Sequence, residues 1–193
     1  MALYTTTALQ NLLEGHVYYR FQDEEVYLDH LMGFIRSGME NKQQILVIDS
    51  MKNIPKIKAR LEKLCTPEEV SMVHIVNNFN YYLLNGDFHT KTILTHFQMD
   101  LSIMKNAKQP IRTWAQVEWC SNNPDAELVR KFESIADDYV LKEHLLSVCA
   151  YSLKALTPEL DTTLEKVHNY VMTDDEFVVS PSYRNSDIDK NNM

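Results

Sequence analysis

The sequence PIRTWAQVEWC, residues 110–120, is the stretch that decides the fold. Because side chains alternate along an extended chain, Arg112, Gln116 and Glu118 share one side and form a polar row. A buried strand seldom carries an arginine, a glutamine, a glutamate and two tryptophans unless some of these groups reach a partner or a ligand. The segment predicts a strand over Ile111 to Trp119 that serves both the sheet and a binding site.

The flanking sequence alternates between strand and helix patterns. Short apolar runs predict strands at residues 16–21, 45–48, 70–76, 145–153 and 177–179. Helical patterns cover residues 7–13, 23–39, 53–64 and 89–106, and two further helices start at residues 123 and 157. Residues 77–88 predict a short helix and a loop that turns at residues 85–86. The alternation predicts an α/β protein: a single three-layer domain with a largely parallel sheet of about five strands flanked by helices. We assign residues 1–183 to this domain and residues 184–193 to a disordered polar tail.

Two of the helices have buried faces that the spacing of apolar residues predicts. For the helix that opens with Asn123 as cap and Pro124 in its first turn, the inward stripe is Leu128, Phe132, Ile135 and Tyr139. For the helix that opens at Thr157, the inward stripe is Leu160, Leu164, Val167 and Val171. The adjacent carboxylates Asp137 and Asp138 do not face each other on a helix, so we expect both to be solvated.

Composition excludes several classes of protein. The net charge is −8 and the cations are scattered, which argues against direct nucleic-acid binding. Residues 1–13 lack the pattern of a signal peptide, and no stretch approaches the roughly 18 apolar residues of a membrane span. Cys65, Cys120 and Cys149 form no Cys-x-x-Cys pair, which favours three buried, reduced thiols in a cytoplasmic protein.

The turn after the first predicted strand is unsuited to nucleotide phosphates. A phosphate loop would place glycines and a lysine there, whereas this chain has Phe21-Gln22-Asp23-Glu24-Glu25. Three carboxylates at the start of a helix repel phosphate. We therefore expect no ATP hydrolysis of the ordinary kind.

No catalytic or metal-binding motif is evident. His89 and His96 lie two helical turns apart, and the seven histidines include no His-Glu-x-x-His. Cys149 falls in the middle of an apolar strand, a setting that does not stabilise a thiolate. We expect no catalytic residue, no metal and no cofactor.

A ligand site is predicted from the rule that ligands bind outside the carboxyl ends of parallel strands. Five residues are expected to line one crevice there: His16, Arg112, Gln116, Trp119 and Tyr151. Two aromatic residues, Tyr82 and Phe88, are expected to cover it. Aromatic walls with a few polar groups suit a small, weakly polar molecule. Two alternatives stay open: the aromatic residues plug the edge of the sheet, and Arg112 forms a structural ion pair with Glu118.

Several segments, taken in order, resemble the MEDS family, the sensory domain named from methanogens, methylotrophs and the dichloromethane regulator. The segments that carry the resemblance are His16–Phe21, Asp23–Gly38, Tyr82–Phe88, Arg112–Trp119, Cys149–Tyr151 and His168. The chain departs from the family pattern at Ala115-Gln116, where the family has Gly-Glu, and at Tyr18, where it has cysteine.

The resemblance implies a fold like that of RecA and KaiC ATPases without their nucleotide chemistry, and a sensor of small organic signals. Members often adjoin a DNA-binding region or a kinase, for which 193 residues leave no room. We therefore expect a non-enzymatic cytoplasmic regulatory module that binds a small organic ligand, a regulatory partner such as a kinase or a transcription regulator, or both. The alternatives are a pure protein-interaction regulator, such as a kinase inhibitor, and a degenerate RecA-like ATPase.

Overall fold

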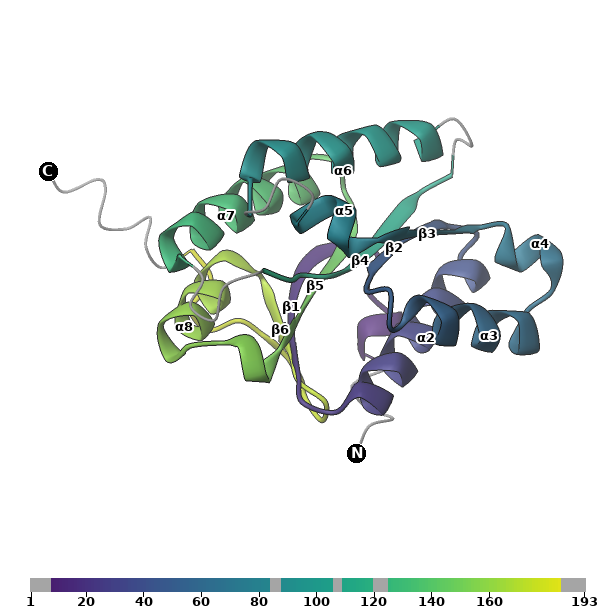
Figure 1. Cartoon of the computed structure of the whole chain (residues 1–193), viewed down its shortest axis with the longest axis horizontal. Helices are drawn as coiled ribbons and strands as arrows, with labels where there is room; N and C mark the ends of the chain where they lie inside the picture. Colours follow the sequence, from purple (N-terminus) through teal and green to yellow (C-terminus); the bar gives the residue numbers. More distant parts are fainter. Residues whose placement is uncertain (1–7, 84–87, 106–108, 120–124, 185–193) are drawn as a thin grey trace, which may run out of the picture.

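Seven strands form one sheet in the order β3-β2-β4-β5-β1-β6-β7 (Figure 1). The computed structural model describes residues 8–83, 88–105, 109–119 and 125–184. The strands are β1 (Gly15–Phe21), β2 (Gln44–Asp49), β3 (Val73–Asn77), β4 (Ile111–Gln116), β5 (Leu146–Ser152), β6 (Tyr170–Met172) and β7 (Phe177–Val179). All neighbouring strands are parallel except β6 and β7, which are antiparallel.

Helices cover both faces of the sheet. They are α2 (Glu24–Glu40), α3 (Ile54–Leu64), α4 (Pro67–Val70), α5 (Asn78–Tyr82), α6 (Thr90–Lys105), α7 (Ala126–Lys142) and α8 (Pro158–Val167), with a 3-10 turn, η1 (Leu153–Ala155). Helices α2 and α3 pack with one core, and α5 to α8 pack with a second core on the opposite face. Figure 1 shows α6 and α7 above the sheet and α2 and α3 below it. The three-layer α/β architecture predicted from the sequence is confirmed.

Local capping explains where two of the long helices begin. The Asp23 carboxylate accepts hydrogen bonds from the backbone N–H groups of Glu25 and Val26, at 2.8 and 3.0 Å. Asp125 caps α7 in the same way, so the helix begins at Ala126. The cap expected at Asn123 is therefore wrong by two residues, and Asn123 and Pro124 lie outside the described residues.

Two segments differ from the sequence prediction, and the sheet has seven strands rather than about five. Val70, predicted to begin the third strand, instead ends α4, because Thr66 and Glu69 build a reciprocal capping box with Pro67 in the first turn; β3 begins at Val73. Val171 lies on β6 rather than on the preceding helix, which ends at Val167. β6 pairs with β1, and this tertiary pairing outweighs the helical spacing.

The buried face of α7 is rotated from the predicted stripe. Phe132 is buried as expected, but Leu128 and Ile135 are 36% and 41% exposed. The face that packs on the sheet instead contains two carboxylates, Glu133 and Asp137. Asp137 was expected to be solvated, and this expectation is wrong.

Two further expectations concern the chain ends and the membrane. Arg184, the first residue of the predicted tail, donates to Asp137 and lies over the Tyr183 ring, while residues 185–193 lie outside the described part. The turn expected at Asn85-Gly86 also lies outside it. Among the residues that the structure describes, no helix has the length and apolar character needed to cross a membrane.

Candidate functional site: a buried cluster of titratable side chains

Six titratable side chains meet beneath α7 and α8, against β1 and β5. We call them the His16 cluster; its members are His16 of β1, Glu133 and Asp137 of α7, Cys149 and Tyr151 of β5, and His168, which directly follows α8. Each of the six is at most 6% exposed. Ionisable groups are rarely buried in such numbers, because each loses hydration that it must recover from neighbours.

The sequence places these groups through two periodicities. His16 and Tyr18 alternate with Val17 along β1, so they point to the α7 face of the sheet. Cys149 and Tyr151 do the same on the adjacent strand, and Tyr18 pairs with Cys149 in the register. Glu133 and Asp137 are four residues apart on α7, so both point to the same side.

Short contacts connect the members. His16 Nε2 lies 3.4 Å from Cys149 Sγ and 3.5 Å from Glu133 Oε2. His168 Nε2 also lies 3.5 Å from Glu133 Oε2, and the two imidazole rings are 3.9 Å apart. Tyr151 Oη donates to Glu133 Oε1. The cluster is one connected network.

A surrounding set of groups orients these side chains. His168 Nδ1 donates to the carbonyl oxygen of Leu164 at 2.8 Å. His16 Nδ1 lies 3.3 Å from Asp137 Oδ1. The other carboxylate oxygen of Asp137 accepts from Tyr183 Oη at 2.9 Å and from Arg184 at 3.0 Å.

Burial and neighbouring charges set the protonation of the cluster. Burial lowers the pKa of His16, and the nearby His168 lowers it further. Burial alone would raise the pKa of Glu133, but its contacts with His168, His16 and Tyr151 hold it below the ordinary value. Burial, followed by the charge of Glu133, raises the pKa of Cys149 well above that of a free thiol. A thiol held neutral beside a carboxylate is a poor nucleophile.

An apolar hollow of about 30 Å³ adjoins the cluster at Cys149. Residues of β2, β4, β5 and of helices α5, α6 and α7 form its walls, among them Tyr82, Ile93, Phe97, Phe132 and Ala136. The volume is comparable to the roughly 30 Å³ that one water molecule occupies in the liquid.

Five of the seven side chains predicted for the ligand site lie on this face of the sheet. His16 and Tyr151 both contact Glu133, and the Trp119 ring lies 5.7 Å from that of Tyr151. The Tyr82 and Phe88 rings are stacked, 5.7 Å apart and inclined by 3°. Phe88 also meets Phe132 at 5.1 Å.

The other two predicted residues are separated from this group by the sheet. Arg112 lies in the opposite core beneath α2, where it donates to the Phe34 carbonyl oxygen at 3.1 Å and lies 4.8 Å over the Phe34 ring. Gln116 follows the same side of β4, and its backbone carbonyl accepts from Asn78 at 3.2 Å. The expectation of one shared crevice is therefore not met. Among the described residues Arg112 forms no ion pair, so a pair with Glu118 is also wrong, and burial lowers the pKa of Arg112 to about 10.

The turn that follows β1 is already occupied by a carboxylate of the chain itself. Asp174, in the turn between β6 and β7, accepts from the backbone N–H groups of Gln22 and Asp23, each at 3.0 Å. Tyr19 Oη also donates to Asp174, at 2.8 Å. The backbone donors with which a phosphate loop would hold an anion are thus engaged.

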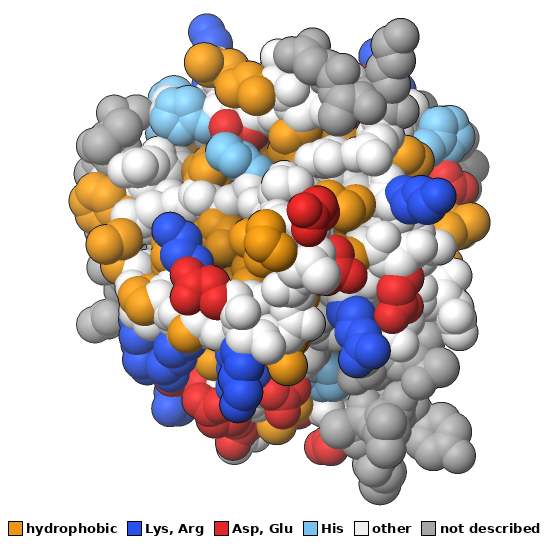
Figure 2. All heavy atoms as spheres, turned by 90° about the vertical axis from the view of Figure 1, so that its right-hand side faces the viewer, with side chains coloured by type: hydrophobic (Ala, Val, Ile, Leu, Met, Phe, Trp, Pro, Cys, Tyr) orange, Lys and Arg blue, Asp and Glu red, His pale blue; other side chains and the backbone are white. Residues whose placement is uncertain are grey.

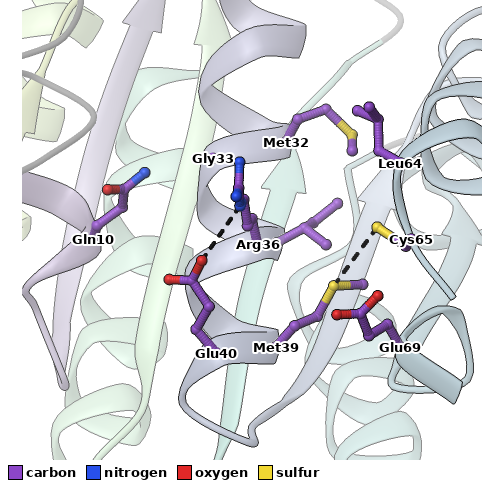
Figure 3. Close-up of a pocket in the computed structure, with 10 residues that line it drawn as sticks. Gln10, Met32, Gly33, Arg36, Met39, Glu40, Leu64, Cys65 and Glu69 are labelled. Atoms are coloured by element: carbon purple, nitrogen blue, oxygen red, sulfur yellow. Dashed lines mark hydrogen bonds and ion pairs between the residues drawn. The ribbon is translucent and has the colours of Figure 1, made fainter.

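A larger, open groove of about 550 Å³ lies beside α2 (Figure 3). Helix α2 packs on the opposite face of the sheet from the cluster. Met32, Met39 and Cys65 line it, and Cys65 Sγ lies 3.9 Å from Met39 Sδ. Burial raises the pKa of Cys65, so its thiol is not activated. The groove contains none of the predicted site residues.

Glu133, Asp137, Cys149 and His168 were not selected for the site by sequence reasoning. They lie at widely separated positions, so no local spacing joins them to His16. One signal was available: Glu133 and Asp137 share a helix face with Val129, Ala136 and Val140. The expectation that Asp137 is solvated ran against this signal.

Comparisons with known proteins place this geometry in context. The model of the MEDS family, described as the methanogen/methylotroph, DcmR sensory domain, matches residues 15–169. An ATPase domain of known structure superposes with a TM-score of 0.58 at 10% identity, covering 88% of this chain and 74% of that chain. A KaiC-like protein from the archaeon Pyrococcus horikoshii OT3 superposes with a TM-score of 0.53 at 12% identity, covering 82% and 70%. No curated protein matches the chain. At such low identity the two structures establish a RecA/KaiC-like fold and nothing about activity.

Proposed function

Because the chain belongs to the MEDS family of sensory domains, which gives it a signalling or regulatory role, we propose that it is a non-enzymatic module that binds a small organic ligand in the hollow beside the His16 cluster. The observation that carries the proposal is the position of Cys149, which belongs both to the polar network and to the apolar wall. A site with an apolar wall and a few convergent polar groups suits a small, weakly polar molecule.

Helix α6 is the element through which binding would reach a partner. Its inner residues Ile93 and Phe97 line the hollow, and its outer residues Met99 and Ile103 are 58% and 63% exposed. A ligand larger than the hollow binds only the conformation in which α6 has moved outward, and it therefore shifts the population toward that conformation. A regulatory protein, such as a kinase or a transcription regulator, would read the displaced outer face.

The absence of catalysis belongs to the same proposal. The acidic turn after β1, with its backbone donors bound to Asp174, supports a fold that has lost nucleotide binding. We place the degenerate-ATPase alternative behind the sensory one for this reason.

Protein interaction without a ligand is the second candidate, and one observation favours it. β3 ends the sheet with one unpaired edge, next to an open groove of about 390 Å³ between α3, α4 and β3. Figure 2 looks at this side of the molecule; hydrophobic side chains lie near the middle of the face, and side chains of both charges are mixed around them. An exposed strand edge is a common place for another chain to add.

The experiment that tests the sensory proposal fills the hollow. Ala136 lines it from α7, so Ala136→Leu places extra atoms where the ligand would bind. Ala126→Leu makes the same change on the same helix, outside the hollow, and serves as the control. The measurement is mass spectrometry of small molecules that co-purify with the native protein and with each variant.

We expect a molecule bound to the wild type and to Ala126→Leu, and absent from Ala136→Leu with the fold intact by circular dichroism. If nothing co-purifies and all three proteins capture the same partner equally, the interaction-regulator alternative replaces the sensory proposal.

A further inference from the structure

Three atoms that can donate an electron pair converge in the His16 cluster: His168 Nε2, Glu133 Oε2 and His16 Nε2. His168 Nδ1 is committed as a donor to Leu164, so in the neutral ring Nε2 presents its lone pair. The Glu133 Oε2 atom lies 3.5 Å from this nitrogen and 3.5 Å from His16 Nε2. Neither Glu133 Oε2 nor His168 Nε2 has a hydrogen-bond partner, although both are fully buried. Such an arrangement is costly unless a proton or a metal ion lies between these atoms.

We propose that His16, Glu133, Cys149 and His168 bind one divalent transition-metal ion of the zinc class. One ligand atom from each of these four residues lies within 4.8 Å of those of the others. This site goes beyond the sensory role and does not depend on it.

The distances fit a tetrahedral ion. Metal–ligand bonds of 2.0–2.3 Å at tetrahedral angles separate neighbouring ligand atoms by roughly 3.4 Å. The separations in the structure are 3.4 Å from His16 Nε2 to Cys149 Sγ, and 3.5 Å from Glu133 Oε2 to each histidine Nε2. The remaining pairs close in when the ion binds.

The charges fit a divalent ion. A thiolate and a carboxylate supply two negative charges, and two neutral imidazoles complete the set, so the loaded site is neutral overall. Binding releases the Cys149 thiol proton to solvent, because a coordinated thiol is deprotonated. Mixed nitrogen, sulfur and carboxylate ligands suit zinc better than calcium or magnesium, which prefer oxygen.

The groups around the ligands are those that metal sites use. His168 donates its second nitrogen to a backbone carbonyl, and His16 Nδ1 faces the carboxylate of Asp137. Tyr151 holds the second oxygen of Glu133. Such partners fix the ring orientation and raise the basicity of the ligands. The expectation of no metal rested on the spacing of histidines along the sequence. Such spacing cannot reveal a site whose ligands come from separate parts of the chain.

The test uses the full chain, stripped of metal by a chelator and titrated with Co²⁺ and then with Zn²⁺. We expect one ion per chain, a thiolate-to-cobalt charge-transfer band in the near ultraviolet, and a tetrahedral visible spectrum. Cys149→Ser abolishes the charge-transfer band, and His168→Gln weakens Zn²⁺ binding at least about tenfold. Cys65→Ser, which alters a thiol beside α2, leaves both unchanged.

Two results would overturn the site. One is a substoichiometric Co²⁺ signal with the octahedral spectrum of the hydrated ion. The other is a folded Cys149→Ser variant that retains the wild-type band, because the ion would then lie elsewhere. Neither result bears on whether an organic molecule occupies the hollow, which the Ala136→Leu comparison decides separately.

Discussion

At the scale of single residues, two networks of buried polar groups lie on opposite faces of the sheet. The His16 cluster is one of them. The other joins Trp114, Tyr27, Asp49 and Asn53: Trp114 Nε1 donates to Tyr27 Oη at 2.9 Å, and Tyr27 Oη donates to Asp49 at 2.6 Å. Asn53 Nδ2 donates to the same carboxylate at 3.0 Å. This second network connects β4 and β2 to α2 and to the start of α3. Each member forms at least one hydrogen bond with another member.

Asp49 makes the stability of the protein depend on pH. Burial raises the pKa of Asp49 from 3.8 to about 6, although Tyr27, Ser50 and Asn53 oppose the shift. Since the folded state holds the proton more tightly, the stabilisation is complete below pH 3.8 and is lost as pH rises through 6. The difference corresponds to about 3 kcal/mol in the free energy of unfolding.

The expected result is that Asp49→Asn flattens the fall in unfolding free energy between about pH 4 and 7, because the amide does not ionise. Urea denaturation at several pH values measures it. Asp175→Asn, at an exposed position, keeps the wild-type profile. An Asp49→Asn variant with the same pH slope as wild type would show that Asp49 ionises as it does in water.

At the scale of elements, the close approach of α2 to the sheet depends on one glycine. A Cβ atom at Gly38 would lie 2.8 Å from Ile45 Cγ1 and 2.9 Å from Arg112 Cδ. Gly33, on the same helix, borders the open groove in Figure 3. The two glycines therefore have different roles in one helix.

We predict opposite effects of alanine at these two positions. Gly38→Ala should destabilise the protein by about 1–3 kcal/mol, because overpacking outweighs the gain in helix propensity. Gly33→Ala should stabilise it by roughly 0.5–1 kcal/mol, since a helical glycine is replaced without a clash. Thermal denaturation of both variants decides the matter, and a stabilised Gly38→Ala would disprove the close approach.

Most of the elements could be predicted from the sequence, and the exceptions have physical causes. The strand predicted over Ile111 to Trp119 is present but ends at Gln116, and the side that Arg112 and Gln116 share follows from alternation. α4 and β6 were missed because a capping box and a strand pairing outweighed apolar spacing. The cluster was missed because its members meet only in three dimensions. His16, Cys149 and His168 each lie in a segment that resembles the MEDS family, but the resemblance does not indicate that the three side chains are in contact.

At the scale of the whole molecule, the fold is RecA/KaiC-like, and the turn after β1 has carboxylates where a phosphate loop would have glycines and a lysine. The carboxylate of Asp174 occupies the backbone donors at Gln22 and Asp23. The ligand site that we propose lies beneath α6 and α7 rather than at the carboxyl edge of the sheet, where the sequence placed it.

ATP should therefore not bind in the manner of a phosphate loop. Isothermal titration calorimetry with Mg-ATP is expected to give no binding heat for the wild type. Asp174→Ala frees the two backbone donors but leaves Asp23, Glu24 and Glu25 in place, so it should not create a site. Micromolar binding that is abolished by changing residues 22–25 would contradict this prediction.

The most direct test of the central claim is hydrogen–deuterium exchange of the native chain, with and without the small-molecule fraction of a cell extract. The account predicts that exchange changes in α6, residues 90–105, and in the α7 residues around Ala136, because the ligand enters between these helices. The Ala136→Leu variant should show no such change, and Ala126→Leu should behave as wild type. Equal exchange with and without the fraction, or the same response in Ala136→Leu, would contradict ligand binding in the hollow.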